Sequence, residues 1–165
     1  MSDYRRAHIP GGCFFFTVVT RKREPWLADA DAMQRLRQAF CETMRKRPFS
    51  IDAIVVLPDH LHAIWRLPPG DADFSTRWRL IKHSVSVTPP RQWHWQPRFW
   101  EHILRDENDW RRHVEYIHYN PVKHGYARTP WEWPHSSFRR AVERGWHSKD
   151  WGATEPSGLP AETGE

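Results

Sequence analysis

The sequence is poor in cysteine, in glycine-rich loops and in long apolar runs, and each absence excludes a class of protein. Its two cysteines, Cys13 and Cys41, lack CxxC spacing and are too few for a disulfide framework, so we expect free thiols. The pair Gly11-Gly12 is too short to cradle a nucleotide phosphate. No apolar run approaches the roughly 20 residues of a membrane span, and the N-terminus lacks the apolar stretch of a signal peptide. These absences predict a soluble, cytoplasmic protein with no membrane contact.

Charge and aromatic content favour a polyanionic partner. The formal net charge is +5, but residues 148–165 contain one lysine and four acidic residues, which leaves +8 on residues 1–147. The chain also contains 11 tryptophans. In so hydrophilic a chain some of them must lie near the surface, where indole rings can stack on unpaired bases. Nucleic acid is therefore the partner class that the composition favours.

A length of 165 residues fits one domain of alternating strands and helices. Runs of β-branched and aromatic residues predict strands at 13–20, 49–57, 61–67 and 98–105. Apolar periodicity predicts helices at about 30–46, 76–86, 108–119 and 136–145. Ser75 is expected to cap the second helix and Asn120-Pro121 to end the third. We predict an α+β domain with a mainly antiparallel sheet over residues 1–147, followed by a disordered tail, residues 148–165.

The stretch "LPDHLHAIW", residues 57–65, places His60 and His62 in an otherwise apolar run. Side chains alternate along a strand, so both imidazoles project to one side, with Cα atoms roughly 6.5 to 7 Å apart. Two nitrogens can then converge on one metal ion. The alternative is a pair of polar residues on a solvated face, but Leu61 and the apolar neighbours place this strand in the core, where buried imidazoles need partners.

An oxygen ligand is needed to complete such a site. Zinc usually requires further ligands in a compact pattern, and the two cysteines are poorly placed for it. Mg²⁺ or Mn²⁺ accepts imidazole together with an oxygen and leaves positions open for phosphate. Tyr116 and Asn120 are four residues apart and share one helix face, offering a phenol and an amide oxygen. Taken alone, Tyr116 could also be an aromatic at the core edge and Asn120 a helix cap.

Together these motifs resemble the single-tyrosine HUH transposases, in particular the REP-associated tyrosine transposase branch. The resemblance covers nearly the whole chain, through "FFFTVVT", "LPDHLHAIW", "DADFSTRWRLIK", "RFWEHILRDENDWRRHVEYIHYNPVKHGY" and "WPHSSFRRAVERG". One departure is Leu57, where methionine is expected, and this is a change in packing rather than in chemistry.

The resemblance implies a ferredoxin-like or RRM-like fold that cuts and rejoins single-stranded DNA next to palindromic hairpins. It implies that His60, His62 and Asn120 hold Mg²⁺ or Mn²⁺, and that Tyr116 attacks to form a 5′-phosphotyrosine. Tyr119 is the rival nucleophile, but it lies about 100° around the helix from Asn120, so we predict that it packs or stacks. The sequence identifies no base for the phenol proton.

The surface that holds DNA is predicted between Phe74 and Trp100, a stretch without acidic residues. Basic residues suit phosphate contacts and indoles suit base stacking. The predicted residues are Arg77, Arg79, Lys82, Arg91, Arg98, Trp78, Trp93 and Trp95. Lys123 either reaches a phosphate or interacts with the helix dipole. The alternative is a solvated helix face followed by a packed loop.

Two other functions remain open at this stage. One is a non-catalytic nucleic-acid-binding regulator on the same scaffold, and the other is a metal-dependent hydrolase that acts through water. A monomer and a homodimer are both compatible with the sequence.

Overall fold

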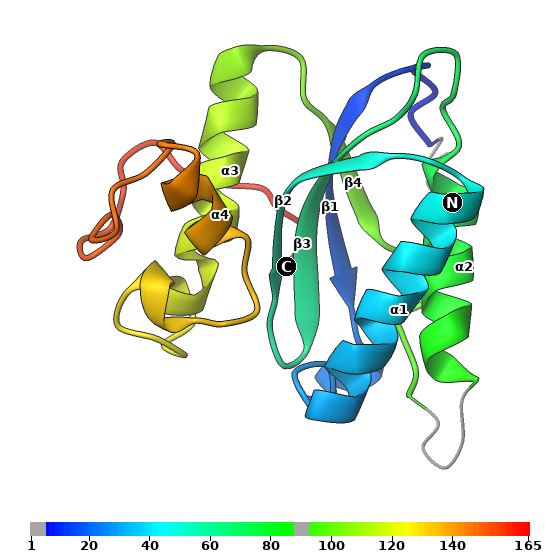
Figure 1. Cartoon of the computed structure of the whole chain (residues 1–165), viewed down its shortest axis with the longest axis horizontal. Coiled ribbons are helices and arrows are strands. Elements are labelled where there is room, and N and C mark those ends of the chain that lie inside the picture. The colour runs from blue at the N-terminus through cyan, green and yellow to red at the C-terminus, as the bar shows by residue number, and fades with distance from the viewer. Residues whose placement is uncertain (1–5, 88–92) are drawn as a thin grey trace.

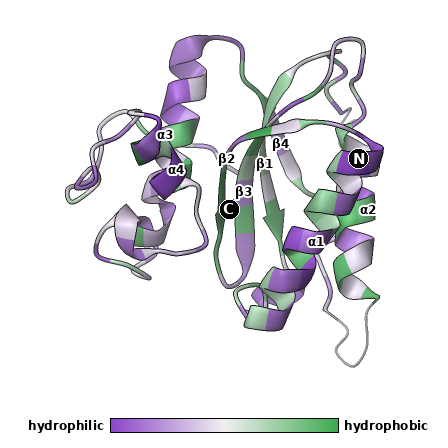
Figure 2. Cartoon of the chain, in the orientation of Figure 1, coloured by the Kyte–Doolittle hydropathy of each residue, from purple (hydrophilic) through white to green (hydrophobic). Residues whose placement is uncertain are grey.

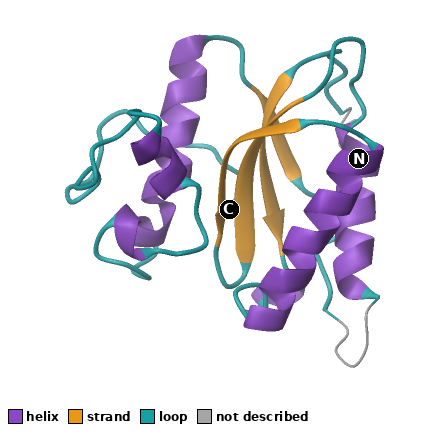
Figure 3. Ribbon diagram, in the orientation of Figure 1, coloured by secondary structure: helices purple, strands orange, loops and turns teal. Residues whose placement is uncertain are grey.

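The computed structural model describes residues 6–87 and 93–165, and in them one antiparallel sheet separates two helical layers (Figure 1). The strands are β1 (Cys13–Val19), β2 (Ser50–Val56), β3 (His60–Arg66) and β4 (Trp100–Ile103), in the order β2-β3-β1-β4. Helices α1 (Ala30–Lys46) and α2 (Phe74–Ser86) cover one face, and α3 (Glu107–Lys123) lies on the other. The order βαββαβ is ferredoxin-like, which confirms the predicted fold class. Short helices η1 (Arg21–Arg23), η2 (Pro130–Glu132) and α4 (Phe138–Glu143) complete the secondary structure of the described residues (Figure 3).

Alternation along the two central strands assigns neighbouring residues to opposite layers. Leu61, Ala63 and Trp65 of β3 are fully buried and pack with α1 and α2 in the larger core cluster. Ile64 and its cross-strand partner Phe15 pack instead with residues of α3. Figure 2 shows hydrophobic colour along much of the sheet and hydrophilic colour over most of α3. We call the two sides of the sheet the core face, covered by α1 and α2, and the site face, covered by α3.

The third helix continues through its proline. The prediction that Asn120-Pro121 ends the helix is wrong, because α3 runs to Lys123 with Pro121 inside it. Proline cannot donate to the carbonyl four residues earlier, but the amide of His124 still donates to the Asn120 carbonyl at 3.1 Å. The helical conformation therefore extends one turn further than the sequence predicts.

The second helix begins earlier than predicted. Its N-cap is Asp73, whose carboxylate accepts a hydrogen bond from the Thr76 amide at 3.0 Å, so the prediction that Ser75 is the cap is wrong. Aspartate and serine are both favoured at N-caps, and the sequence offers each of them within three positions.

The end of the chain packs on the site face of the sheet. The composition of residues 148–165 predicts disorder, whereas Thr163 is only 5% exposed and its carbonyl accepts a hydrogen bond from the Thr17 hydroxyl. Gly164 has a φ of +73° and lies against the ring of Trp100, where any side chain would collide. The red segment in Figure 1 crosses from α3 toward the strands.

Two expectations from composition can be compared with the structure directly. Cys13 and Cys41 are free thiols, as predicted. Among the described helices, none combines the length and the apolar composition that crossing a membrane requires.

Candidate active site

The two histidines of β3 lie side by side on the site face. Their ring centroids are 4.9 Å apart, and His60 and His62 are 1% and 0% exposed. This confirms the same-side geometry expected from strand alternation. Both imidazoles are buried between the sheet and α3, so neither belongs to a solvated strand face.

Hydrogen bonds to one ring nitrogen orient each imidazole. The Nδ1 atom of His60 lies 2.7 Å from the Asp59 carboxylate, and the Nδ1 atom of His62 lies 2.7 Å from the Thr17 hydroxyl. Because a carboxylate only accepts, His60 donates through Nδ1, and in the neutral ring its Nε2 atom carries a lone pair. Burial lowers the pKa of His62 to about 4, although a hydrogen bond with Glu165 opposes this shift. Burial therefore favours the uncharged form of His62, which metal ligation requires, while the Glu165 carboxylate favours the charged form.

Helix α3 brings Tyr116 and Asn120 against this pair. They are one turn apart, 2% and 0% exposed, and the Tyr116 ring meets His62 edge-on with centroids 5.2 Å apart. Within the described residues, the Nε2 atom of His60 and the Oδ1 atom of Asn120 are buried and have no hydrogen-bond partner. Unpaired buried polar atoms destabilise a fold, so such atoms usually mark a place where another group binds.

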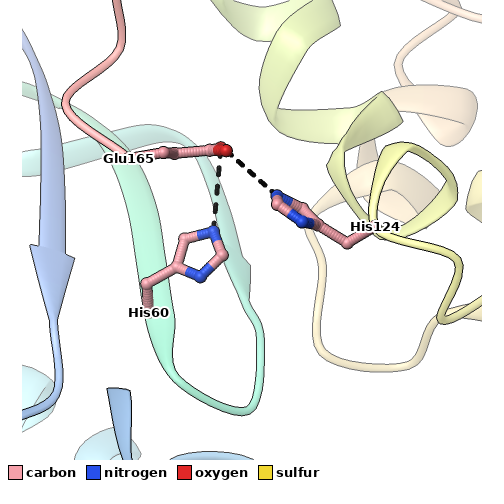
Figure 4. Close-up of side chains that lie close together, drawn as sticks. All are labelled: His60, His124 and Glu165. Carbon is pink, nitrogen blue, oxygen red and sulfur yellow. Dashed lines mark hydrogen bonds and ion pairs between the residues drawn. The ribbon is translucent and has the colours of Figure 1, made fainter. Parts of the chain in front are cut away.

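A carboxylate from the end of the chain lies in the middle of this cluster. The Glu165 Oε1 atom is 2.7 Å from His62 Nε2 and 2.9 Å from Asn120 Nδ2, and it accepts a hydrogen bond from Tyr116. Figure 4 shows the Glu165 carboxylate between His60 and His124. Its Oε1 atom lies 3.7 Å from His60 Nε2, and its Oε2 atom lies 3.1 Å from His124 Nε2. Burial by itself raises the pKa of Glu165, but hydrogen bonds with His124 and His62, together with the nearby His60 imidazole, outweigh burial and hold this pKa well below its ordinary value.

The donor set of this site is suitable for a metal ion. Nitrogen or oxygen atoms of His60, His124 and Glu165 lie within 4.8 Å of one another. The two atoms without a hydrogen bond, His60 Nε2 and Asn120 Oδ1, are an imidazole nitrogen and an amide oxygen, both of which Mg²⁺ and Mn²⁺ accept. The geometry therefore provides groups able to bind a metal ion.

Comparisons with known proteins establish the family. No family profile matches the chain. A REP-associated tyrosine transposase of Escherichia coli K12 is 50% identical over 151 residues, which cover 92% of this chain and 91% of that protein. This chain belongs to the REP-associated tyrosine transposases. A relative in Haemophilus influenzae, named for the same group, is 38% identical over 92% of this chain and 94% of its own length.

A solved structure agrees with this assignment. A REP-associated tyrosine transposase bound to a REP hairpin superimposes with a TM-score of 0.87 at 48% identity, covering 100% of this chain and 98% of that one. The prediction that the protein is an enzyme, a transposase, is confirmed.

Two residues of the predicted DNA surface belong to the transposase core instead. Arg77 is 1% exposed and its guanidinium is fully engaged, with Asp71 at 2.7 Å and the Pro48 carbonyl at 2.8 Å. Trp78 is 0% exposed and stacks on Trp65 with centroids 4.2 Å apart. Their prediction as DNA contacts is corrected on this ground, because neither side chain reaches solvent. Trp78 faces the sheet, and Arg77 faces the end of α1 and the loop before α2.

Three further residues of that surface are also turned inward. Trp93 and Trp95 are 5% and 8% exposed and both pack on Trp26, so neither indole is free to stack on a base. Lys82 donates to the Gln96 carbonyl at 2.7 Å, and burial lowers its pKa to about 8. Trp78, Trp93 and Trp95 therefore contribute to the core, whereas Trp100, at the end of the same stretch, is 37% exposed.

The remaining predicted contacts divide into three groups. Arg79 and Arg98 are exposed and available for phosphate. Arg91 lies outside the described residues. Lys123 turns into the site, where its Nζ atom is 3.0 Å from the Tyr116 hydroxyl. Sequence reasoning missed Glu165, because nothing in the composition of the tail indicates that its last residue reaches the site.

Proposed function

We propose that this transposase cuts and rejoins single-stranded DNA beside palindromic hairpins, with Tyr116 as nucleophile and with His60, His62 and Asn120 holding Mg²⁺ or Mn²⁺. The observation that carries the proposal is a pair of buried ligand atoms that lack a hydrogen bond, His60 Nε2 and Asn120 Oδ1, next to the Tyr116 phenol. The hairpin in the solved relative supports the choice of substrate. Both free thiols and a DNA substrate support a cytoplasmic location.

The proposed ligands suit a phosphate substrate. Two imidazoles and one amide are neutral donors, so they leave the positive charge of an ion available to an anionic ligand. A bound Mg²⁺ or Mn²⁺ would polarise the scissile phosphate and neutralise the charge that develops on it. All four side chains come from one chain, so a second copy is not required to complete the site.

The covalent step conserves the energy of the phosphodiester. The Tyr116 oxygen forms a bond to phosphorus as the phenol proton passes to water. The bond from phosphorus to the 3′ oxygen breaks, and the 3′ oxygen takes up a proton from water. The products are a 5′-phosphotyrosine and a free 3′-hydroxyl. Rejoining reverses these changes and needs no nucleotide cofactor, in agreement with the lack of a phosphate-cradling glycine loop.

The described conformation keeps the phenol in its protonated form. Burial raises the pKa of Tyr116 and the hydrogen bond to Glu165 raises it further, while hydrogen bonds from Lys123 and Thr163 oppose the change. The scissile phosphate and the Glu165 carboxylate are both anions, and they compete for the same hydrogen-bond donors in the site. Cleavage therefore requires Glu165 to leave the site when DNA enters.

The test removes one oxygen atom, the phenol oxygen of Tyr116. Tyr116→Phe keeps the ring and should abolish both strand cleavage and the covalent adduct on a hairpin-flanked single strand, while hairpin binding stays near wild type. Tyr119→Phe is the matched control on the same helix and should keep cleavage. Its ring is half-buried and packs near Gly152 of the tail. An adduct that peptide mapping assigns to Tyr119 contradicts the proposed nucleophile, and unchanged cutting in both variants favours a hydrolase that uses water.

The role of the metal ion has its own test. Cleavage should require added Mg²⁺ or Mn²⁺ and should stop when a chelator is added in excess. The cation should also raise the thermal stability of the wild type more than that of His60→Ala, because binding to the folded state stabilises it. Cutting that persists undiminished in excess EDTA contradicts the metal site.

A further inference from the structure

The phenol oxygen of Tyr116 has a cation beside it. The Nζ atom of Lys123 lies 3.0 Å from that oxygen and 4.9 Å from the centre of the Tyr116 ring. Lys123 is seven residues further along α3, which is close to two full turns, so both side chains leave the helix on one face. From the sequence, Lys123 either reaches a phosphate or interacts with the helix dipole, but the structure directs its ammonium group at the atom proposed to attack.

We propose that Lys123 is a catalytic residue whose ammonium group donates a hydrogen bond to the Tyr116 oxygen and stabilises negative charge there during cleavage and rejoining. The inference rests on the proposed function, because it assumes that Tyr116 is the nucleophile. It supplies a role for a residue that the proposed metal ligands and nucleophile leave unexplained.

The chemistry of a phenol creates a need for such a group. Phenols have a reference pKa of about 10 and attack weakly while they carry their proton. In cleavage the proton passes to water as the bond from oxygen to phosphorus forms, so negative charge develops on the oxygen. In rejoining a 3′-hydroxyl passes its proton to water and attacks phosphorus, the bond to the Tyr116 oxygen breaks, and that oxygen leaves with the negative charge. A fixed ammonium donor stabilises the same oxygen in both directions.

The surroundings of Lys123 are consistent with this role. Within the described residues its carboxylate partner is Glu165, whose Oε2 atom lies 3.0 Å from Nζ. When Glu165 leaves the site, the ammonium group loses that anion and keeps its contact with the Tyr116 oxygen. The other donor on this oxygen is the Thr163 hydroxyl at 2.9 Å, which belongs to the same tail segment as Glu165. If the tail withdraws, Lys123 is the donor that α3 itself supplies.

The experiment separates rate from binding. Lys123→Met removes the charge and keeps most of the aliphatic stem, and Lys123→Arg keeps a charged donor. At saturating DNA, the single-turnover rate of adduct formation should fall about 100-fold in Lys123→Met, the size of effect seen when one charge-stabilising donor is lost. The rate of rejoining, measured by adding a strand with a free 3′-hydroxyl to the isolated adduct, should fall by a similar factor. Lys123→Arg should restore part of both rates.

Affinity measurements distinguish a catalytic role of Lys123 from a phosphate contact that only binds DNA. Hairpin affinity and its salt dependence should remain near wild type in Lys123→Met, whereas loss of a phosphate contact lowers the salt slope by about one counterion. Lys46→Met is the matched control, because it removes one exposed lysine from α1 on the opposite side of the sheet. It should change neither rate.

The outcomes distinguish the two proposals. If the wild type forms an adduct on Tyr116 and Lys123→Met forms it equally fast, the role of Lys123 is overturned and the proposed function stays intact. A slower reaction that saturating DNA fully restores, together with a lower salt slope, also overturns it and assigns Lys123 to phosphate binding. Absence of any Tyr116 adduct in the wild type instead contradicts the proposed function.

Discussion

The two faces of the sheet differ in the kind of polar atom that they leave unpaired. On the core face of the described residues, the unpaired buried atoms include the indole nitrogens of Trp26, Trp65 and Trp78, each on a large ring packed in the apolar cluster. On the site face they include His60 Nε2 and Asn120 Oδ1, and the Nδ1 atom of His135, beside the edge strand β2, is also unpaired. An indole nitrogen can only donate, and it tolerates isolation when the ring buries enough apolar area. An unpaired imidazole nitrogen or amide oxygen accepts, and a cation satisfies it.

This difference indicates how one strand serves both stability and chemistry. Adjacent residues of β3 lie in opposite layers, so the strand buries Leu61 on one side and presents His60 on the other. Apolar burial on the core face stabilises the fold and offsets the destabilising effect of the unpaired polar atoms on the site face. Such departures from full hydrogen bonding are expected at functional sites.

The largest expected effect comes from replacing two adjacent residues of β3, one on each face of the sheet, by alanine. His60→Ala should abolish adduct formation and should lower stability by less than Leu61→Ala, which should cost about 2–5 kcal/mol as a large-to-small change in a packed core. Urea unfolding of both variants, measured beside adduct yield, checks the comparison. The folded fraction of Leu61→Ala should still form the adduct. If His60→Ala unfolds as readily as Leu61→Ala, His60 serves packing rather than chemistry.

The residues of the site face were predictable because they follow local periodicities. His60 and His62 are two positions apart on a strand, and Tyr116 and Asn120 are four apart on a helix, so each pair is placed by geometry within one element. That the pairs meet depends on the packing of α3 on the sheet. Alternating apolar residues do not specify this packing, and only the family resemblance predicted it.

Other features depend on contacts that sequence patterns do not contain. Arg77 and Arg79 differ only in which side of α2 they occupy, and composition counts both as basic. Trp93 and Trp95 are apolar enough for a core and aromatic enough for base stacking. The residue type alone therefore does not decide between core packing and DNA contact. Glu165 reaches His62 across 103 residues of sequence, and no local pattern records a contact at that separation.

The second effect tests the assignment of Arg77 to the core face. Arg77→Ala removes the guanidinium that joins Asp71 to the carbonyls of Arg47 and Pro48, and we expect a loss of about 3 kcal/mol in the free energy of unfolding. Hairpin affinity of the folded protein should not change. Arg79→Ala, two positions away and exposed, should leave stability intact and lower the salt slope of DNA binding by about one. If Arg77→Ala instead lowers the salt slope and leaves stability intact, Arg77 is a DNA contact.

Acid denaturation gives an independent check of the same residue. The hydrogen bonds from Arg77 lower the pKa of Asp71 to about 2. A carboxyl with a lowered folded-state pKa contributes stability above its unfolded pKa of about 4 and loses it as the pH falls toward 2. The wild type should therefore lose this contribution between about pH 4 and pH 2, and Arg77→Ala should show a flatter dependence there. Equal slopes would mean that Arg77 does not stabilise the Asp71 anion.

A smaller effect is expected from the tail on the site face. Glu165 bonds to His62 and Asn120, where the scissile phosphate is proposed to enter, so Glu165→Ala should raise the rate of adduct formation severalfold at subsaturating DNA. Glu162→Ala removes the same charge from an exposed position of the same segment and is the control. A lower rate in Glu165→Ala alone would show that the carboxylate takes part in the reaction.

The smallest effect concerns the helix that covers the core face. Asp73→Ala removes the side chain that accepts from the Thr76 amide and should lower stability by about 1 kcal/mol, the usual effect of losing an N-cap. Ser75→Ala should change stability by only a few tenths of a kcal/mol, because Ser75 lies inside the first turn. Neither change should alter adduct formation, since α2 and the site are on opposite faces of the sheet. If adduct formation falls in Asp73→Ala while the protein stays folded, the core face also influences the chemistry and the two faces are not independent.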